Sequence, residues 1–173
     1  VVDDGSRDGS IELIKRYCQQ YPNIHLYQHE GRSNKGLPQT VQLGIQKASG
    51  KYIAFCESDD WWDCHHAEEL LTFIESHPEA KMVFNHIEVI NGVGTDKWCR
   101  YAEECNAFLA GNQGRNIFMA LDRNYMLTFS AACIHKDLLL SCDFNAYHPQ
   151  YIDFWLWRQL CLRYPIHYVE HAI

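Results

Sequence analysis

The sequence predicts an α/β fold in which a mostly parallel central sheet is flanked by helices. Short apolar runs at 1–2, 24–28 and 51–56 alternate with segments of helical apolar spacing at 10–21 and 37–48. Strands that alternate with helices in this way are typical of a parallel sheet covered on its faces. Acidic polar turns follow the first and third of these runs, and ligands bind at the carboxyl ends of the strands in such sheets.

The rest of the chain is patterned less regularly. Gly92, Gly94, Gly111 and Gly114 punctuate residues 91–125, which we expect to be a mobile lid or substrate loop. The other expected elements are a helix over 65–76, a strand over 81–90, a strand and short helix over 129–139, a helix over 152–160 and a final strand over 166–173.

Length and composition indicate one soluble globular domain. The 173 residues include 47% hydrophobic and 21% charged residues. A formal net charge of -7 argues against nucleic acid as a non-specific partner. No apolar run approaches the roughly 20 residues that span a bilayer. We expect a single domain over 1–173.

The cysteine pattern predicts the redox state of the thiols, and the first residues predict how the domain begins. The eight cysteines form no CxxC pair, which favours reduced thiols and a cytoplasmic location over a disulfide framework. The chain opens on Val1 without an initiator Met. We therefore expect a domain truncated at its N-terminus.

Two acidic turns are the candidate functional features. Asp3, Asp4 and Asp8 follow the first apolar run, where aspartate also serves ordinary turn and capping roles. The second turn has the sequence CESDDWWDC and holds four carboxylates, those of Glu57, Asp59, Asp60 and Asp63. One of them could cap the following helix, but two adjacent aspartates at a strand end exceed what one cap requires.

A divalent cation would compensate the second acidic turn. Mg²⁺ and Mn²⁺ take oxygen ligands, and Mg²⁺ is commonly held by one or two carboxylates together with substrate phosphates. We therefore expect Mn²⁺ or Mg²⁺ on these carboxylates, carrying a diphosphate.

Three separated motifs resemble one enzyme family. The segments VVDDGSRDGS, NKGLPQTVQLGIQKASGKYIAF and ESDD are similar, in this order, to the nucleotide-binding half of the family 2 glycosyltransferases. The similarity is dense over about residues 1–90, and it implies that 1–90 is the half that binds the nucleotide sugar and metal and that 91–173 is the half that binds the acceptor. It implies a Rossmann-like nucleotide-diphospho-sugar transferase fold, the glycosyltransferase A fold, whose first strand would precede this chain.

The resemblance assigns roles to matching residues. Asp3 and Asp4 correspond to the family's first acidic pair, one member of which contacts the base, and we favour Asp4. Asp60 corresponds to the metal ligand and Asp59 to a ligand of the ribose or metal. The Asn34, Lys35 and Gly36 loop also matches a nucleotide-binding segment. Glu57 stands where many members have Asp, and Val41 and Gln42 stand where many have Arg and Asn.

The catalytic base is assigned by the same resemblance. Inverting members use a carboxylate of a Glu-Asp pair, ahead of a Trp-containing helix, to deprotonate the acceptor. Here Asp153 matches, with Ile152 in place of the Glu and Trp155 or Trp157 as the aromatic residue. The alternative is that Asp153 only occupies the first turn of its helix, where the helix dipole favours an acidic side chain.

The function that follows is inverting sugar transfer. A nucleotide-diphosphate sugar, by default a UDP-sugar, would donate to the hydroxyl of a glycan or lipid-linked acceptor. We expect Trp61, Trp62 and His148 to contact the acceptor, and we also note His86 on the strand after the metal motif. The expected setting is the cytoplasm, at the inner face of the cytoplasmic membrane, with any membrane contact made by other segments.

The sequence has three alternative interpretations. Cys64, His65 and His66 could suggest zinc, but adjacent residues bind one tetrahedral ion poorly. A nucleotidyltransferase would be expected to show a basic, glycine-rich phosphate loop near the start, and none is visible. A catalytically inactive module that binds a sugar nucleotide or glycan stays open, because the first strand and the Glu before Asp153 are both missing.

Overall fold

The computed structural model describes residues 1–90, 95–145 and 148–170, and these form helices and strands in the alternating order expected of an α/β chain. They divide into two compact units. The first consists of Val1–Ser49 and Asp143–Ile152, and the other described residues make up the second. This division follows backbone packing, and the functional halves 1–90 and 91–173 stay a prediction.

The first unit is built on a short parallel sheet. Strand β1 (Val2–Asp3) pairs with β2 (Tyr27–Gln28). Gly44 lets the second helix approach β1, because a Cβ at this position would lie only 3.4 Å from Val2 Cγ2. The other elements of this unit are α1 (Ser10–Gln20), η1 (Glu30–Arg32), α2 (Leu37–Lys47) and η4 (Pro149–Tyr151).

The start of α1 is stabilised by the aspartate just before it. Ser10 is the first helical residue, and Gly9 occupies the capping position. Asp8 Oδ1 accepts a hydrogen bond of 3.0 Å from the backbone N–H of Ser10. The carboxylate of Asp8 therefore satisfies one of the free N–H groups at this helix end.

The second unit contains a four-stranded mixed sheet. Its strands are β3 (Tyr52–Ala54), β4 (Met82–Asn85), β5 (Ala132–His135) and β6 (His167–Val169), in the spatial order β3-β5-β4-β6. β5 runs antiparallel to both β3 and β4, whereas β4 and β6 are parallel. The sheet is thus less parallel than the helix–strand alternation of the first half suggests, because β5 comes from the irregular second half of the chain.

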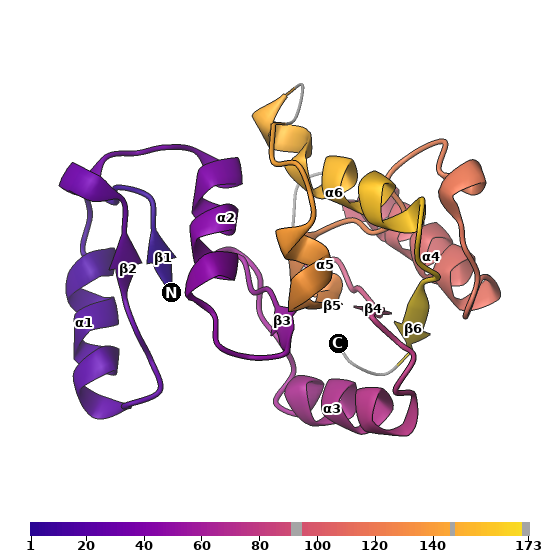
Figure 1. Ribbon diagram of the computed structural model, residues 1–173, viewed down its shortest axis with the longest axis horizontal. Helices are drawn as coiled ribbons and strands as arrows, with labels where there is room; N and C mark the ends of the chain where they lie inside the picture. Colours follow the sequence, from indigo (N-terminus) through magenta and orange to yellow (C-terminus); the bar gives the residue numbers. More distant parts are fainter. Residues whose placement is uncertain (91–94, 146–147, 171–173) are drawn as a thin grey trace. The chain divides into compact units, whose positions relative to one another are not determined.

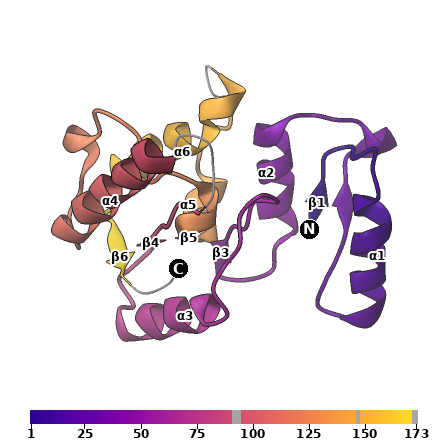
Figure 2. The same cartoon turned by 180° about the vertical axis from the view of Figure 1, so that it is seen from behind.

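Helices cover both faces of this sheet (Figures 1 and 2). On one face, Leu70 of α3 (His66–Ser76) packs in a buried cluster with Val83 and Cys133. On the other, Trp157 of α6 (Ile152–Cys161) meets Phe84 edge to face, with ring centroids 5.3 Å apart. All four residues of β4 are buried, as expected for a strand covered on both faces.

The segment expected to be a mobile lid contains a long helix. The expectation is wrong for α4 (Thr95–Gly111), and residues 91–94 lie outside the described part of the chain. Ala102, Cys105 and Leu109 are buried, at a spacing that forms one helical stripe. The sequence concealed this stripe because small residues carry much of it. Three short helices complete the unit: η2 (Phe118–Ala120), η3 (Phe129–Ala131) and α5 (Lys136–Leu140).

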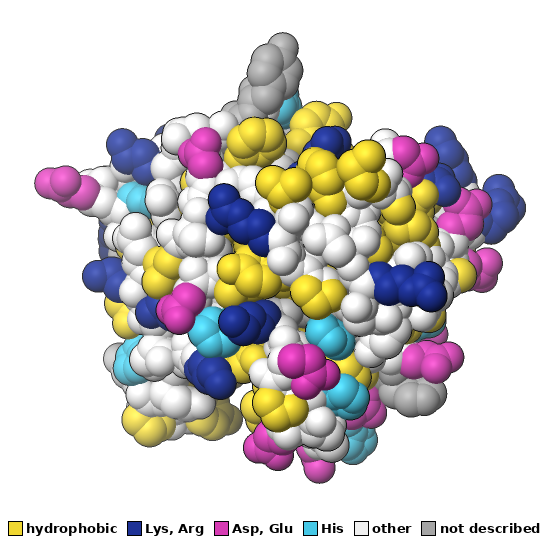
Figure 3. Space-filling model, turned by 45° about the vertical axis from the view of Figure 1, so that its right-hand side comes forward, with side chains coloured by type: hydrophobic (Ala, Val, Ile, Leu, Met, Phe, Trp, Pro, Cys, Tyr) yellow, Lys and Arg dark blue, Asp and Glu magenta, His cyan; other side chains and the backbone are white. Residues whose placement is uncertain are grey.

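The surface agrees with the composition. On the face shown in Figure 3, Asp, Glu and His side chains gather over α3. All eight cysteines are free thiols, and Cys105, Cys133 and Cys161 are buried. Among the described residues, no helix has both the length and the apolar character that crossing a bilayer requires.

The packing of Trp157 generates a stability prediction. This side chain is fully buried and contacts Phe84 and Phe129, so Trp157→Ala should lower the free energy of unfolding by about 3–5 kcal/mol. Trp157→Phe should cost less, because the indole N–H has no hydrogen-bond partner among the described residues to lose. Urea denaturation measures both. Trp98→Ala, at a side chain 55% exposed, is the control, and an equal loss in all three variants would contradict this packing.

Candidate active site

The acidic turn after β3 is closed by its own backbone and by one threonine. The N–H of Asp60 donates to the carbonyl of Glu57 at 3.2 Å. Thr128 Oγ1 lies 3.0 Å from Asp60 Oδ2 and also hydrogen-bonds Glu57 Oε2. Asp59 and Asp60 are exposed at this turn. Both predicted metal-binding carboxylates are therefore accessible, and one is restrained by a residue far away in the sequence.

Glu57 anchors the turn to the segment that enters β5. Its backbone N–H donates to Ser130 Oγ at 2.8 Å, and its carboxylate accepts from the N–H of Phe129 at 3.2 Å. Burial raises the pKa of the Glu57 carboxyl, although Thr128 and Phe129 both donate to it. Glu57 thus has a supporting position, whereas Asp59 and Asp60 face solvent.

A pocket of about 130 Å³ opens beside this turn. It is lined by the turn, by the end of β4 and by the residues before β5: Asp59, Asp60, Trp61, Trp62, Asn85, His86, Ile87, Glu88, Ile90, Thr128, Ser130 and Ala131. Trp61 is 70% exposed on its wall. Trp62 is held more firmly, because its indole N–H donates to the carbonyl of Ser130 at 3.1 Å and its ring stacks on His66 at 4.4 Å. Trp61 is therefore the freer aromatic surface.

The residues of this turn suit a hard divalent cation. Asp59 and Asp60 offer carboxylate oxygens at the mouth of the pocket, and oxygen donors are the ligands that Mg²⁺ and Mn²⁺ prefer. Two carboxylates leave coordination positions for phosphate oxygens. The donor chemistry thus fits the predicted Mn²⁺ or Mg²⁺.

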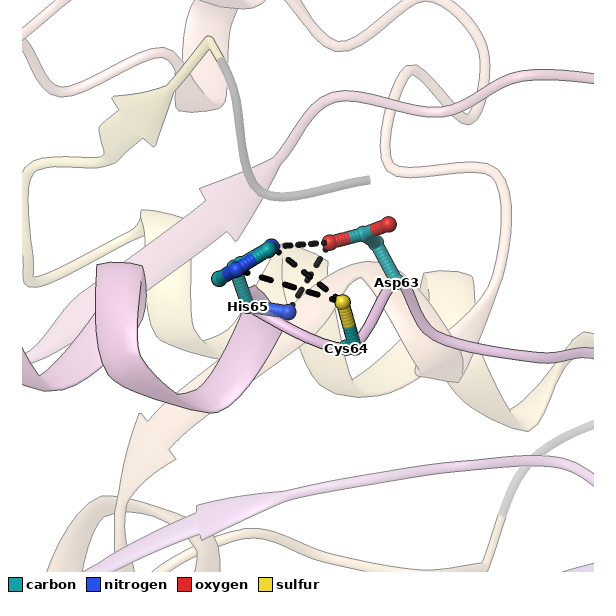
Figure 4. Close-up of side chains that lie close together, drawn as sticks. All are labelled: Asp63, Cys64 and His65. Carbon is teal, nitrogen blue, oxygen red and sulfur yellow. Dashed lines mark hydrogen bonds and ion pairs between the residues drawn. The ribbon is translucent and has the colours of Figure 1, made fainter.

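A second group of metal-type side chains lies at the start of α3. Within the described residues, Asp63, Cys64 and His65 bring one potential ligand atom each within 4.8 Å of one another (Figure 4). All three are exposed, and Asp63 Oδ1 accepts from the backbone N–H of His65 at 2.8 Å. His66, which the zinc reading included, is buried against Trp62. The ordinary role of Asp63 is therefore to close the turn into α3.

In the first unit, the two aspartates after β1 differ in exposure. Asp3 is buried and accepts hydrogen bonds from the N–H groups of Gly5 and Ser6 and from the Gln28 amide. A hydrogen bond from the Ser6 side chain, together with those from Gln28 and from the backbone N–H groups of Ser6 and Gly5, holds the pKa of Asp3 below its ordinary value. Asp4 is only half-buried. Asp3 thus shapes the turn, and Asp4 is the better placed of the two to meet a ligand.

Asp4 organises the predicted nucleotide loop. Its carboxylate accepts from the backbone N–H groups of Lys35 at 2.7 Å and Gly36 at 2.9 Å. Gly36 adopts a φ of +84° directly before α2, a conformation that favours glycine. Asn34 and Lys35 are exposed. The structure therefore brings Asp4 together with the loop that the sequence grouped with it.

His148 lies in this unit too, at η4. Its Nδ1 accepts from the N–H of Gln150 at 3.4 Å, and its ring lies 5.5 Å from that of Tyr151. His148 is exposed, and these contacts give it a capping role. Its predicted contact with the acceptor stays a prediction.

Asp153 lies in the first turn of α6, as both readings of the sequence expected. Its Oδ2 accepts a 2.7 Å hydrogen bond from the Asn124 amide. Burial raises the pKa of Asp153, which makes its carboxylate a stronger base. Asp153 is not among the described residues that line the pocket beside Asp60. Its environment suits proton abstraction, and its reach to a substrate stays a prediction.

Sequence reasoning missed several residues that build this site. Thr128 and Ser130 fix the acidic turn, Asn124 contacts Asp153, and Asn85 and Glu88 line the pocket. Thr128 and Ser130 stand in a segment without a recognisable motif. A signal existed only for Asn85, because it is a polar residue at the end of an apolar strand, where α/β sheets bind ligands.

Comparison with known proteins identifies the family of this chain. Residues 1–139 match the model of the family described as glycosyl transferase family 2. The chain belongs to glycosyl transferase family 2. With membership comes the Rossmann-like glycosyltransferase A fold, so the resemblance and the fold class inferred from the sequence are both confirmed, with a mixed sheet in the second unit.

Individual relatives carry glycosyltransferase names. An uncharacterized glycosyltransferase of Rickettsia bellii is 34% identical over 118 residues, which is 68% of this chain and 15% of that protein. The putative glycosyltransferase EpsH of Bacillus subtilis is 34% identical over 71 residues, 41% of this chain and 20% of its own length. The cholesterol galactosyltransferase of Borreliella burgdorferi is 33% identical over 60 residues, 35% of this chain and 16% of its own. The matches thus span at most a fifth of these relatives.

The bonds of Asp4 generate a prediction for this glycosyltransferase chain. Asp4→Ala should cost about 1.5–3 kcal/mol of unfolding free energy, because two backbone N–H groups lose a charged acceptor. Amide hydrogen exchange should accelerate at Lys35 and Gly36. Asp8→Ala, which removes an exposed acceptor at α1, is the control and should leave these two amides protected. Unchanged exchange at Lys35 and Gly36 in Asp4→Ala would contradict the prediction, because the loop would then keep its structure without the Asp4 carboxylate.

The buried carboxyl of Asp153 generates a pH prediction. Its pKa is raised in the folded protein, so the folded state loses stability as rising pH ionises this group. Asp153→Asn should therefore be more stable than the wild type at pH 7, and the gain should shrink as the pH falls toward 3.8, the ordinary value. Denaturant titrations across this range measure it. Asp137→Asn, at a side chain 82% exposed, is the control, and a less stable Asp153→Asn at pH 7 would contradict the prediction.

Proposed function

We propose that this chain is the part of an inverting glycosyltransferase that binds donor and acceptor, and that the enzyme moves a sugar from a nucleotide-diphosphate sugar to a hydroxyl group. The observation that carries the proposal is the exposed Asp59–Asp60 turn at the mouth of a pocket, in a chain of family 2. UDP is the default nucleotide. A glycan or lipid-linked hydroxyl is the proposed acceptor, and the inner face of the cytoplasmic membrane is the proposed setting.

Each group of residues has a proposed task. Asp60, with Asp59, would hold Mn²⁺ or Mg²⁺ on the diphosphate, and the bound cation supplies Lewis-acid stabilisation of the leaving phosphate's charge. Asp4 and the 34–36 loop would hold the nucleotide, with Asp3 fixing the turn beneath it. Thr128 and Glu57 would keep the Asp60 carboxylate oriented while the diphosphate binds.

The chemical step would need one base and one acceptor surface. Asp153, whose pKa is raised by burial, would remove the proton of the acceptor hydroxyl as that oxygen attacks the anomeric carbon. Attack from the face opposite the leaving diphosphate inverts the anomeric centre. Trp61 and Trp62 offer aromatic faces for the acceptor, and His148 is a third proposed contact.

The alternative is a module that binds a sugar nucleotide without transferring the sugar. The missing Glu before Asp153 supports it, since Ile152 is fully buried and offers no carboxylate. Release of free nucleotide from a nucleotide sugar distinguishes the two. An enzyme would release it in the presence of Mn²⁺, and Asp153→Asn would slow the release about a hundredfold or more, the usual contribution of a general base. A binding module would release none.

Calorimetric titration tests the donor site. UDP, GDP and dTDP are titrated with and without Mn²⁺, and we expect one of them to bind in a metal-dependent way. Asp60→Asn should weaken that binding about tenfold or more, because the metal loses a charged ligand. Asp63→Asn, four residues from Asp59 on the same acidic segment, should bind normally. A loss confined to Asp63→Asn would instead place the metal at the start of α3.

A further inference from the structure

The segment over residues 122–126 is anchored on α4. The ring of Tyr125 is buried and stacks on Phe108, with centroids 3.7 Å apart. The hydroxyl of Tyr101 donates to the backbone carbonyl of Asn124 at 2.7 Å. Both Phe108 and Tyr101 belong to α4. The backbone that carries the Asn124 side chain is therefore held in place by this helix.

The amide of Asn124 is oriented so that its nitrogen meets Asp153. Its Oδ1 accepts a hydrogen bond from the backbone N–H of Met126 at 3.2 Å, so the oxygen is used within the segment. Its Nδ2 donates to Asp153 Oδ2 at 2.7 Å. A donated hydrogen bond to a carboxylate oxygen stabilises the ionised carboxylate. The orientation of the amide thus favours the ionised form of Asp153.

Burial and neutral donors determine the environment of Asp153. Burial raises the pKa of its carboxyl, and the backbone N–H groups of Phe154 and Asp153 and the Asn124 amide act in the opposite direction. The charged side chains on the neighbouring segments have other partners in the described part of the chain: Arg123 pairs with Glu104, Asp122 accepts from the Tyr125 hydroxyl, and Arg158 lies over the Phe154 ring. The Asn124 amide is therefore the side-chain donor that offsets the burial of this carboxylate.

We propose that Asn124 is a positioning residue for the base: its amide holds one carboxylate oxygen of Asp153 and keeps this group ionised, ready to take the proton of the acceptor hydroxyl. This inference rests on the proposed function and adds a residue to its chemical step. The acceptor proton passes to Asp153 while the acceptor oxygen bonds the anomeric carbon, and the nucleotide diphosphate leaves with the electron pair of the broken bond. Asn124 acts on this step through Asp153.

Asn124→Ser separates the bond to Asp153 from the shape of the segment. A hydroxyl can accept the N–H two residues ahead, as Thr128 Oγ1 does from Ser130 at 3.2 Å, but the serine side chain is one bond too short to replace the amide nitrogen. The pKa of Asp153 should rise by about one unit, because its carboxylate loses a donor. Carbon-13 NMR titration of the side-chain carboxyl measures this pKa, and the loss of the signal in Asp153→Asn assigns it.

A matched control and a second variant complete the titration. Asn116 Oδ1 also accepts the N–H two residues ahead, that of Phe118 at 3.0 Å, and Asn116 is exposed, so Asn116→Ser should leave the pKa of Asp153 unchanged. Asn124→Asp keeps an oxygen for the N–H of Met126 and replaces the donor with a second carboxylate. The upper apparent pKa of the resulting pair should exceed that of Asp153 in the wild type, which keeps the test decisive if Asn124→Ser does not fold.

The pH profile of nucleotide release shows whether this bond serves the reaction. Release from a panel of UDP, GDP and dTDP sugars is followed with Mn²⁺. In Asn124→Ser the acidic limb of kcat should move to higher pH by about the same unit, and the rate should recover above it, because Asp153 must be ionised to act as a base. A variant that only loosens the fold would lose rate at every pH.

The outcomes separate this inference from the proposed function. If the carboxyl titration of a folded Asn124→Ser or Asn124→Asp is the same as in the wild type, the inference fails alone. It also fails alone if Asn124→Ser loses rate equally at every pH while Asp153→Asn slows release as proposed. If Asp153→Asn releases nucleotide as fast as the wild type, or if no sugar of the panel is released, the proposed function fails and this inference fails with it.

Discussion

The antiparallel insertion of β5 between β3 and β4 is the constraint on which the second unit depends. Because β5 runs opposite to its neighbours, the segment that enters it lies at the edge where β3 and β4 end, with Ala54 paired to Cys133 and Phe84 to Ala132. Thr128 and Ser130 are therefore within reach of the acidic turn. A parallel strand in this position would enter the sheet at the opposite edge and leave Glu57 without these partners.

The resulting hydrogen bonds give the carboxylates of the acidic turn different roles. Glu57 is partly buried and satisfied by Thr128, Ser130 and the N–H of Phe129, so it positions the turn. Asp59 and Asp60 remain exposed. Burial raises the cost of ionising Glu57, and the like charges of Asp60 and Asp59 add to that cost. A cation bound at Asp60 would lower the repulsion, which is why the arrangement suits a metal-dependent enzyme.

In the first unit, the two aspartates after β1 also have different roles. Asp3 accepts hydrogen bonds from the backbone of its own turn. Asp4 accepts hydrogen bonds from the backbone of the loop before α2. Asp3 and Asp4 are adjacent in sequence, yet their partners lie on different segments. Two adjacent carboxylates can thus stabilise two different segments, the turn after β1 and the loop before α2.

The sequence by itself determined the family, the α/β class and the acidic turns, because these depend on local patterns: strand runs, helical spacing and the motifs around Asp4 and Asp60. It did not determine the direction of β5 or the helix α4, whose buried stripe is made largely of small residues. Nor did it give the supporting role of Thr128 or the buried position of Asn85 beside the pocket. Those features arise from contacts between residues distant in sequence, and only the tertiary structure decides which distant residues meet.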